Sequence, residues 1–121
     1  MSVHGGYVPL RGGTIATAVG IETRGGVLTP LVPAGTAVPA ARTEVFTTAD
    51  DGQPTIKISV FAGSGSRVAD ATSLGRFELI LPGYAQRGIP QIAVTFAVDA
   101  SGGFQLTAVD GDGRELAIRS F

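Results

Sequence analysis

The chain has 121 residues, a length that suits one domain around one hydrophobic core. Hydrophobic residues make up 44% of it, charged residues make up 16% and the formal net charge is −1, which excludes a disordered composition and a basic nucleic-acid-binding surface. Cysteine is absent, so disulfides and thiolate metal sites are excluded as well.

We expect residues 1–13, "MSVHGGYVPLRGG", to form a flexible arm or linker remnant, and residues 14–121 to form the domain. Within the domain, apolar and polar residues alternate with the period of a β-strand. In "TIKISVF", Ile56, Ile58 and Val60 share one face of the predicted strand. The same alternation predicts further strands in "RFELIL", "QIAVTFAVD", "FQLTAVD" and "ELAIRSF".

Short segments rich in glycine and aspartate separate these strands. "DASGG" at Asp99–Gly103 and "DGDG" at Asp110–Gly113 supply residues that tolerate the positive φ of tight hairpin turns. The chain also contains 18 glycines and 7 prolines, and no long segment shows the 3.6-residue period of a helix. The sequence therefore predicts an all-β fold, an antiparallel β-sandwich of about eight short strands.

Several catalytic chemistries are missing. His4 is the single histidine and lies in the arm, so no Ser-His-Asp triad is expected. "FAGSGSR" lacks the Gly-Lys-Ser/Thr ending of a phosphate-binding loop, and "DGDG" lacks the spaced carboxylates of an EF-hand. An enzyme that uses Asp50, Asp51 or Asp70 as a base is an alternative, but it would require a metal or cofactor for which the sequence offers no ligand set. We therefore expect a binding protein and not an enzyme, with no metal and no cofactor.

Longer stretches carry a more specific signal. "GIETRGGVLTPLVPAGTAVPA" and "EVFTTADDGQPTIKISVFAG", followed by "ADATSLGRFEL", "RGIPQIAVTFAVDASG" and "LTAVD", resemble in order and spacing the substrate-binding β-sandwich of Hsp70 (DnaK-type) chaperones. The resemblance covers roughly Val19 to Ile118, without the family's ATPase domain and without its helical lid. It implies that the chain binds short extended hydrophobic segments of unfolded polypeptides in the stress response, joined to an ATPase domain if it belongs to a longer protein.

The resemblance also implies a groove between two loops, the first formed where Gly25 and Gly26 interrupt a strand. The backbone near Thr23 and Thr47 and the side chain of Gln53 would hydrogen-bond the main chain of the peptide. An apolar pocket for one aliphatic side chain would be lined by Ile21, Val27, Phe46, Ile56, Ile58 and Ile92. Alternation alone assigns the last three of these to the core of any sandwich, so both interpretations stay open.

Other family positions are occupied differently here. Arg24 and Ala49 match two side chains that form an arch over the bound peptide and are usually apolar. The stem of Arg24 can cover a peptide while its head favours acidic flanks, although a surface arginine without a role is an equal alternative. Asp51 and Arg87 match positions that latch the lid. Gly13 replaces an aspartate of the interdomain linker, which puts coupling to an ATPase domain in doubt.

The partners follow from these features. No apolar run approaches the ~20 residues of a membrane-spanning helix, and the first residues lack the order of a signal peptide, so we expect a cytoplasmic protein with no membrane or nucleic-acid partner. "YVPL" at Tyr7–Leu10, or the end of the chain at Phe121, could occupy a neighbour's groove and cause self-association. The alternative function is a structural or scaffolding β-domain that recognises one specific protein partner and does not use the groove.

Overall fold

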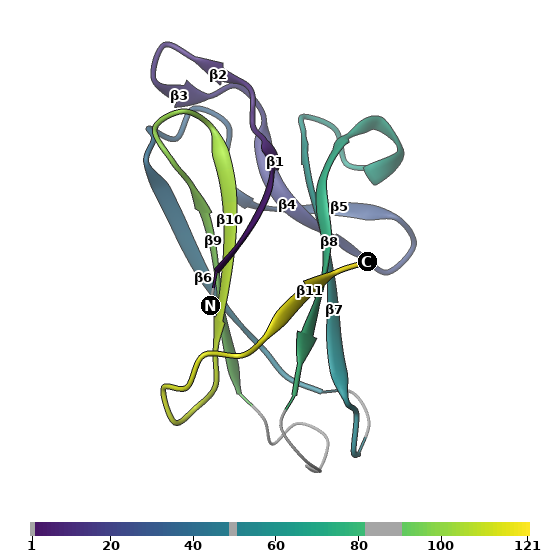
Figure 1. Ribbon diagram of the computed structural model, residues 1–121. Helices are drawn as coiled ribbons and strands as arrows, with labels where there is room; N and C mark the ends of the chain where they lie inside the picture. Colours follow the sequence, from purple (N-terminus) through teal and green to yellow (C-terminus); the bar gives the residue numbers. More distant parts are fainter. Residues whose placement is uncertain (1, 49–50, 82–90) are drawn as a thin grey trace.

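The computed structural model describes residues 2–48, 51–81 and 91–121, which form two antiparallel sheets packed face to face (Figure 1). This confirms the predicted all-β sandwich. The strands are β1 (Ser2–Tyr7), β2 (Leu10–Arg11), β3 (Thr14–Ile15), β4 (Ala18–Thr23), β5 (Val27–Val32), β6 (Ala40–Phe46), β7 (Thr55–Gly63), β8 (Thr72–Ile80), β9 (Ile92–Val98), β10 (Gly103–Val109) and β11 (Ile118–Ser120). In these ranges the helical structure is one 3-10 turn, Val68–Asp70, and no helix there is long and apolar enough to cross a bilayer.

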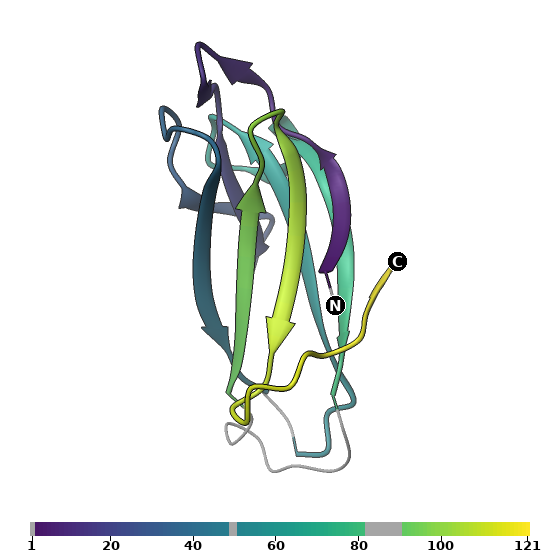
Figure 2. The ribbon, with the colours of Figure 1, turned by 60° about the vertical axis from the view of Figure 1, so that its left-hand side comes forward.

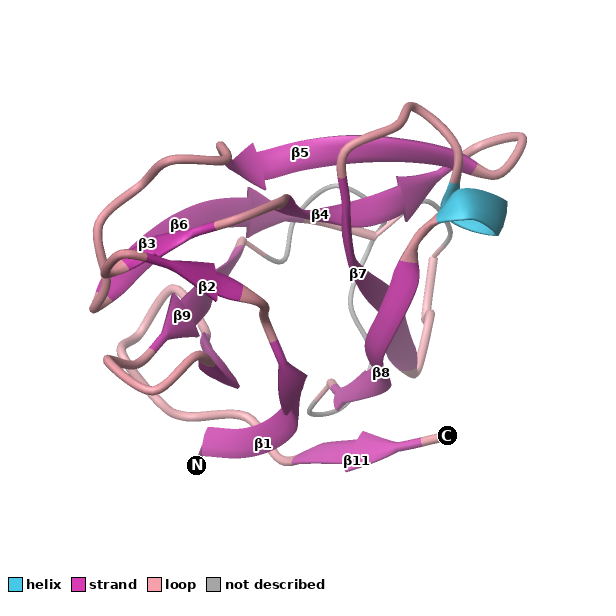
Figure 3. Ribbon diagram, turned by 90° about the horizontal axis from the view of Figure 1, so that it is seen from above, coloured by secondary structure: helices cyan, strands magenta, loops and turns pink. Residues whose placement is uncertain are grey.

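The sheets differ in size. One has four strands in the order β1-β10-β9-β6, and the other has five in the order β11-β8-β7-β4-β5. The short hairpin β2-β3 stands apart from both at the upper end in Figure 1. Seen from above, β5 runs across one end of the layered structure, and β1 and β11 lie at the opposite end (Figure 3).

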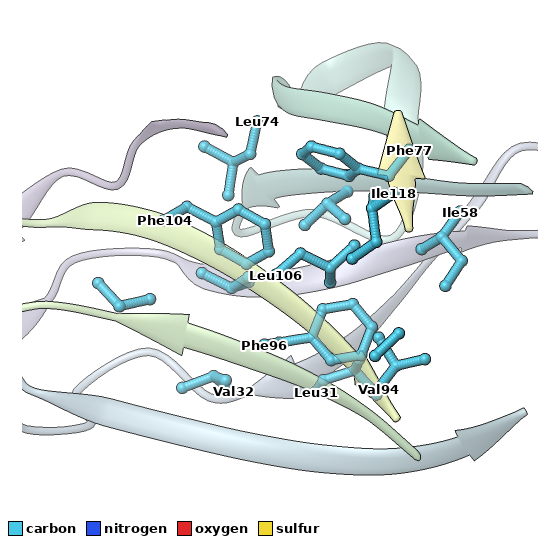
Figure 4. Packing of buried hydrophobic residues seen from close by; sticks show 14 of the residues in the cluster. Leu31, Val32, Ile58, Leu74, Phe77, Val94, Phe96, Phe104, Leu106 and Ile118 are labelled. Atoms are coloured by element: carbon cyan, nitrogen blue, oxygen red, sulfur yellow. The ribbon is translucent and has the colours of Figure 1, made fainter. Parts of the chain in front are cut away.

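The core lies between the sheets, where the alternating residues point. Ile56, Ile58 and Val60 are buried as the alternation predicted. Phe77, Phe96 and Phe104 are at most 1% exposed and come from β8, β9 and β10, so they span both sheets (Figure 4). The ring centroids of Phe77 and Phe104 are 6.1 Å apart, and those of Phe96 and Phe104 are 6.3 Å apart, within the range of favourable aromatic pairs.

The turn between β9 and β10 is built by one carboxylate. Asp99 Oδ1 accepts hydrogen bonds from the Ser101 N–H at 2.9 Å, the Ser101 hydroxyl at 2.7 Å and the Gly103 N–H at 2.9 Å. These bonds hold the pKa of Asp99 below its ordinary value because they stabilise the charged form. The bond from the Ser101 hydroxyl has the largest effect. Gly102 supplies the positive φ of +92°. The hairpin predicted at Asp99–Gly103 is therefore confirmed.

The "DGDG" turn is also held by an aspartate side chain, but the chain after it crosses to the other sheet. Asp110 Oδ1 accepts from the Asp112 and Arg114 N–H groups, both at 2.9 Å. Val109 and Glu115 then form one isolated bridge before the chain crosses to the other sheet, where β11 pairs with β8. The predicted turn is present, but the strand after it does not extend the sheet that contains β10.

The sequence suggested a flexible arm or linker remnant at residues 1–13, and the structure places β1 and β2 within this range. β1 pairs antiparallel with β10, and Val8 is only 3% exposed. Gly12 and Gly13, with φ of +59° and +80°, turn β2 back into β3. Sequence pattern missed β1 because its two central glycines interrupt the alternation, whereas pairing with β10 satisfies its backbone groups.

Candidate functional site

The site expected from the resemblance begins at the turn between β4 and β5. Gly25 and Gly26 have φ of +85° and +73°, a conformation that L side chains rarely adopt. Just before the turn, the Thr23 hydroxyl donates to the Val27 carbonyl at 3.3 Å and lies 2.9 Å from the Thr29 hydroxyl. The two glycines thus reverse the chain, as the sequence predicted.

A second loop braces this turn. Arg67, in the β7–β8 connection, donates from its guanidinium to the Gly25 carbonyl at 3.1 Å. The Val68 N–H donates to the Gly26 carbonyl at 3.0 Å, and Val27 forms an isolated bridge with Arg67. The turn is therefore held from one side by main-chain and side-chain bonds. The contact of Arg67 could not be predicted, because nothing in "FAGSGSR" indicates which distant loop this residue meets.

The six apolar positions expected to line a pocket come from both sheets. Phe46 in β6 lies opposite Ile92 in β9, whereas the other four, Ile21, Val27, Ile56 and Ile58, belong to the five-stranded sheet. Ile56, Ile58 and Ile92 are 6%, 4% and 2% exposed and belong to the central core cluster. Ile21 and Phe46 are half-buried and pack against that cluster, so the core reaches the surface at these two residues. Val27 is 37% exposed and is not part of the cluster.

The polar positions behave differently from one another. Thr23 is bonded within the turn, as described above, and Thr47 is exposed. The Gln53 side-chain amide donates to the Thr55 carbonyl at 2.6 Å, at the start of β7. Thr48, which no sequence pattern singles out, is the buried polar residue of the described ranges, at 6% exposure. The side chain of Gln53 therefore orders its own loop.

The arch and latch positions are only partly described. Arg24 is exposed at the tip of the β4–β5 turn, and Asp51 is exposed between β6 and β7. Ala49 and Arg87 lie outside the described residues, as does Asp50. Asp70 is exposed. Within the ranges that the structure describes, no group of three or more acidic or histidine side chains is arranged to hold a metal ion.

The two apolar ends proposed for self-association have different surroundings. Val8, inside "YVPL", is buried, and its N–H donates to the Gly102 carbonyl at 2.8 Å, so this segment is used within its own fold. Phe121 is 53% exposed, and the Lys57 ammonium lies 5.3 Å from the centre of its ring. Close by on the same sheet, Arg119 pairs with Glu78 at 2.8 Å and lowers the pKa of that carboxyl.

Among the hollows on the described part of the surface are two whose linings include none of the expected groove residues. One, of about 290 Å³, lies on β6, β9 and β10 and is lined by Pro39, Ala40, Ala41, Ala97, Val98, Asp99 and Gln105. The other, of about 260 Å³, is lined by Ile80, Leu81, Asp110, Arg114, Glu115, Leu116 and Ala117. Both are shallow and open to solvent.

Comparison with known proteins assigns the family. The model of the Hsp70 protein family matches residues 13–118. The chain is 46% identical over 98 residues, 81% of its length, to the chaperone protein DnaK of Mycoplasma mycoides. It is 46% identical over 102 residues, 84% of its length, to the chaperone protein DnaK of Methanothermobacter thermautotrophicus. It spans only 17% of the length of either relative. The chain therefore belongs to the Hsp70 family.

Proposed function

We propose that this chain binds short extended hydrophobic segments of unfolded polypeptides and serves as the substrate-binding part of an Hsp70 chaperone. One observation carries the proposal: the family match runs through the glycine turn and through every strand that holds an expected groove residue. The relatives at 46% identity are named chaperone proteins. In a longer protein of this kind, an ATPase domain would be its partner, and the chain itself would use no cofactor.

The surroundings of Ile21 and Phe46 suit an aliphatic ligand. Each is half-buried on the core cluster, so a leucine side chain placed against either would extend the core outward. Burying one such side chain contributes roughly 1.5–3 kcal/mol, and each main-chain hydrogen bond adds about 0.5–1.5 kcal/mol. Ordering the peptide offsets part of this gain. We expect an affinity on the order of micromolar, which corresponds to about −8 kcal/mol and permits release.

The test is fluorescence anisotropy with a labelled leucine-rich heptapeptide. Phe46→Ala should weaken binding about tenfold, because it removes a half-buried wall of the pocket. Val45→Ala is the matched control: Val45 is the preceding residue of β6, is 61% exposed and points to the opposite face, so binding should not change. Thermal unfolding of both variants checks that they fold. Equal loss in the two variants, or no binding by the folded parent, would contradict the proposal.

The scaffolding alternative rests on a specific observation as well. Ile56, Ile58 and Ile92 are at most 6% exposed, so on this interpretation the chain's own side chains fill the groove. A specific folded partner would then pair with the edge strands β5 or β6. A peptide array separates the two functions. Broad binding of leucine-rich peptides supports the chaperone function, and recognition of one partner without peptide binding supports the scaffold.

A further inference from the structure

The N-terminal strand closes one side of the sandwich. β1 pairs with β10 from Ser2 opposite Thr107 to Tyr7 opposite Gly103, with a register shift after His4. It also contacts β8 and β11 of the other sheet. Figures 1 and 2 show it running upward from the N-terminus beside β10, on the side where β8 lies. Without β1, the main-chain groups on one side of β10 would form an open edge.

β1 passes over the core at a glycine, Gly5. A Cβ atom on Gly5 would collide with the Leu74 carbonyl oxygen and would lie 2.9 Å from the ring of Phe104 and 3.3 Å from that of Phe77. Leu74, Phe77 and Phe104 are at most 2% exposed. The backbone of β1 therefore lies directly on these three residues, at a distance that excludes any side chain at this position.

The strand and its acceptor differ in how firmly they are held. β10 places Phe104, Leu106 and Ala108 in the core with no exposed surface. β1 has two consecutive glycines and a register shift at its centre, and Val3, which packs against the core from this strand, is only partly buried. Glycines weaken a strand because they lose more conformational entropy on ordering and bury no side chain. β1 is therefore the weakly held member of the pair.

The family match supports the same division. It begins at residue 13, so β1 lies before the matched part of the chain, whereas β8 and β10 lie within it. The acceptor strand therefore lies inside the matched residues, and β1 lies outside them.

We propose that the edge of β10 is a strand-acceptor site that takes an extended segment with glycine at the crossing over Leu74. β1 occupies the site within one chain, and the N-terminal strand of a second copy is its ligand between chains. Main-chain bonds to β10 supply the affinity, and the glycine crossing supplies the specificity. The site shares none of the residues proposed for the hydrophobic-peptide groove, so the two proposals can fail separately.

The test uses the full chain carrying Gly5→Val, in which β1 can no longer pass over Leu74 and should leave the edge of β10. A labelled peptide of residues 2–9, "SVHGGYVP", is the probe for the strand of a second copy. It should bind this variant with micromolar affinity. It should bind the parent at least tenfold more weakly, because the parent's own β1 competes at a millimolar effective concentration. A leucine-rich heptapeptide should not displace it.

Two altered probes define the specificity. A peptide with valine at the Gly5 position should not bind, whereas a peptide with alanine at the exposed His4 position should bind like the unaltered probe. Equal binding of the valine peptide, displacement by the heptapeptide, or no binding to the folded Gly5→Val chain would overturn the proposal.

Hydrogen exchange on the unaltered chain tests the proposal if Gly5→Val does not fold. The amides of β1 and the alternate amides of β10 that face it should exchange together, at least tenfold faster than the amides of β10 that face β9. Exchange of all these amides at one common rate would show that β1 opens only with the whole fold and would overturn the proposal.

Discussion

Phe104→Ala should be among the most damaging single substitutions in this domain. Phe104 has no exposed surface, and its ring packs on Phe77 of the other sheet and on Phe96 of the neighbouring strand, with centroids 6.1 Å and 6.3 Å away. The backbone of Gly5 also lies close to this ring. The site has contacts from both sheets and from β1, so its walls cannot readily collapse into the space that alanine leaves.

The magnitude follows from these contacts. Replacing a buried phenylalanine by alanine costs about 3–5 kcal/mol, and the aromatic pairs that are lost contribute about 0.5–1.5 kcal/mol each. We expect a value near the upper end, about 5 kcal/mol. Because small domains are stable by only about 5–15 kcal/mol, the variant should be close to unfolding at room temperature.

Urea denaturation followed by circular dichroism measures this loss as a change in the unfolding free energy. Phe121→Ala is the control: its ring is 53% exposed and contacts the Lys57 ammonium, so its loss should stay below about 1 kcal/mol. If Phe104→Ala does not fold, Phe104→Leu should fold with a smaller loss. A loss below about 2 kcal/mol for Phe104→Ala would refute the view that this ring joins the two sheets.

Three further predictions concern the turns. Arg24→Met should change the preference between acidic and basic peptide flanks more than the affinity for leucine-rich peptides; anisotropy with both peptide types tests this, and equal discrimination by parent and variant would contradict it. Gly25→Ala should cost about 1–2 kcal/mol in urea denaturation because φ there is +85°, whereas Gly65→Ala, at an open position without positive φ, should be nearly neutral. The pKa of Asp99 is lowered in the folded state, so the ionised carboxylate should stabilise the fold above the ordinary aspartate pKa. This contribution should disappear as the pH falls through the pKa of Asp99 in the folded state. A pH series of unfolding free energies should therefore show a shallower decline in acid for Asp99→Asn than for the parent.

Local pattern was sufficient to predict the central strands. The alternation of Ile56, Ile58 and Val60 requires one buried face, and the structure buries all three. The Asp99 turn was predictable for a similar reason, because an aspartate side chain can bond the main-chain groups that follow it. In both cases the cause lies within a few residues of the effect.

The features that were missed depend on distant contacts. β1 carries glycine where the carbonyl of Leu74 approaches, and no property of "SVHGGY" indicates that neighbour. The pairing of β11 with β8 of the other sheet could not be predicted, because the turn at Asp110 fixes a reversal of the chain and not the next pairing partner. Among the candidate site residues, the reversal at Gly25 was predictable, whereas the brace by Arg67 depends on how two loops meet.

The pairing of Ser2 with Thr107 also has a consequence for biosynthesis. The strand that leaves the ribosome early in this domain finds its partner only after nearly all of the domain has been translated. Until then the side of the sandwich over Leu74 and Phe77 has no cover, and the nascent chain exposes an apolar strip next to an unpaired edge. Such late closure between distant segments favours slow folding and early aggregation. Shielding of this strip by another protein during translation would therefore matter more for the yield of folded domain than any later stabilisation of its core.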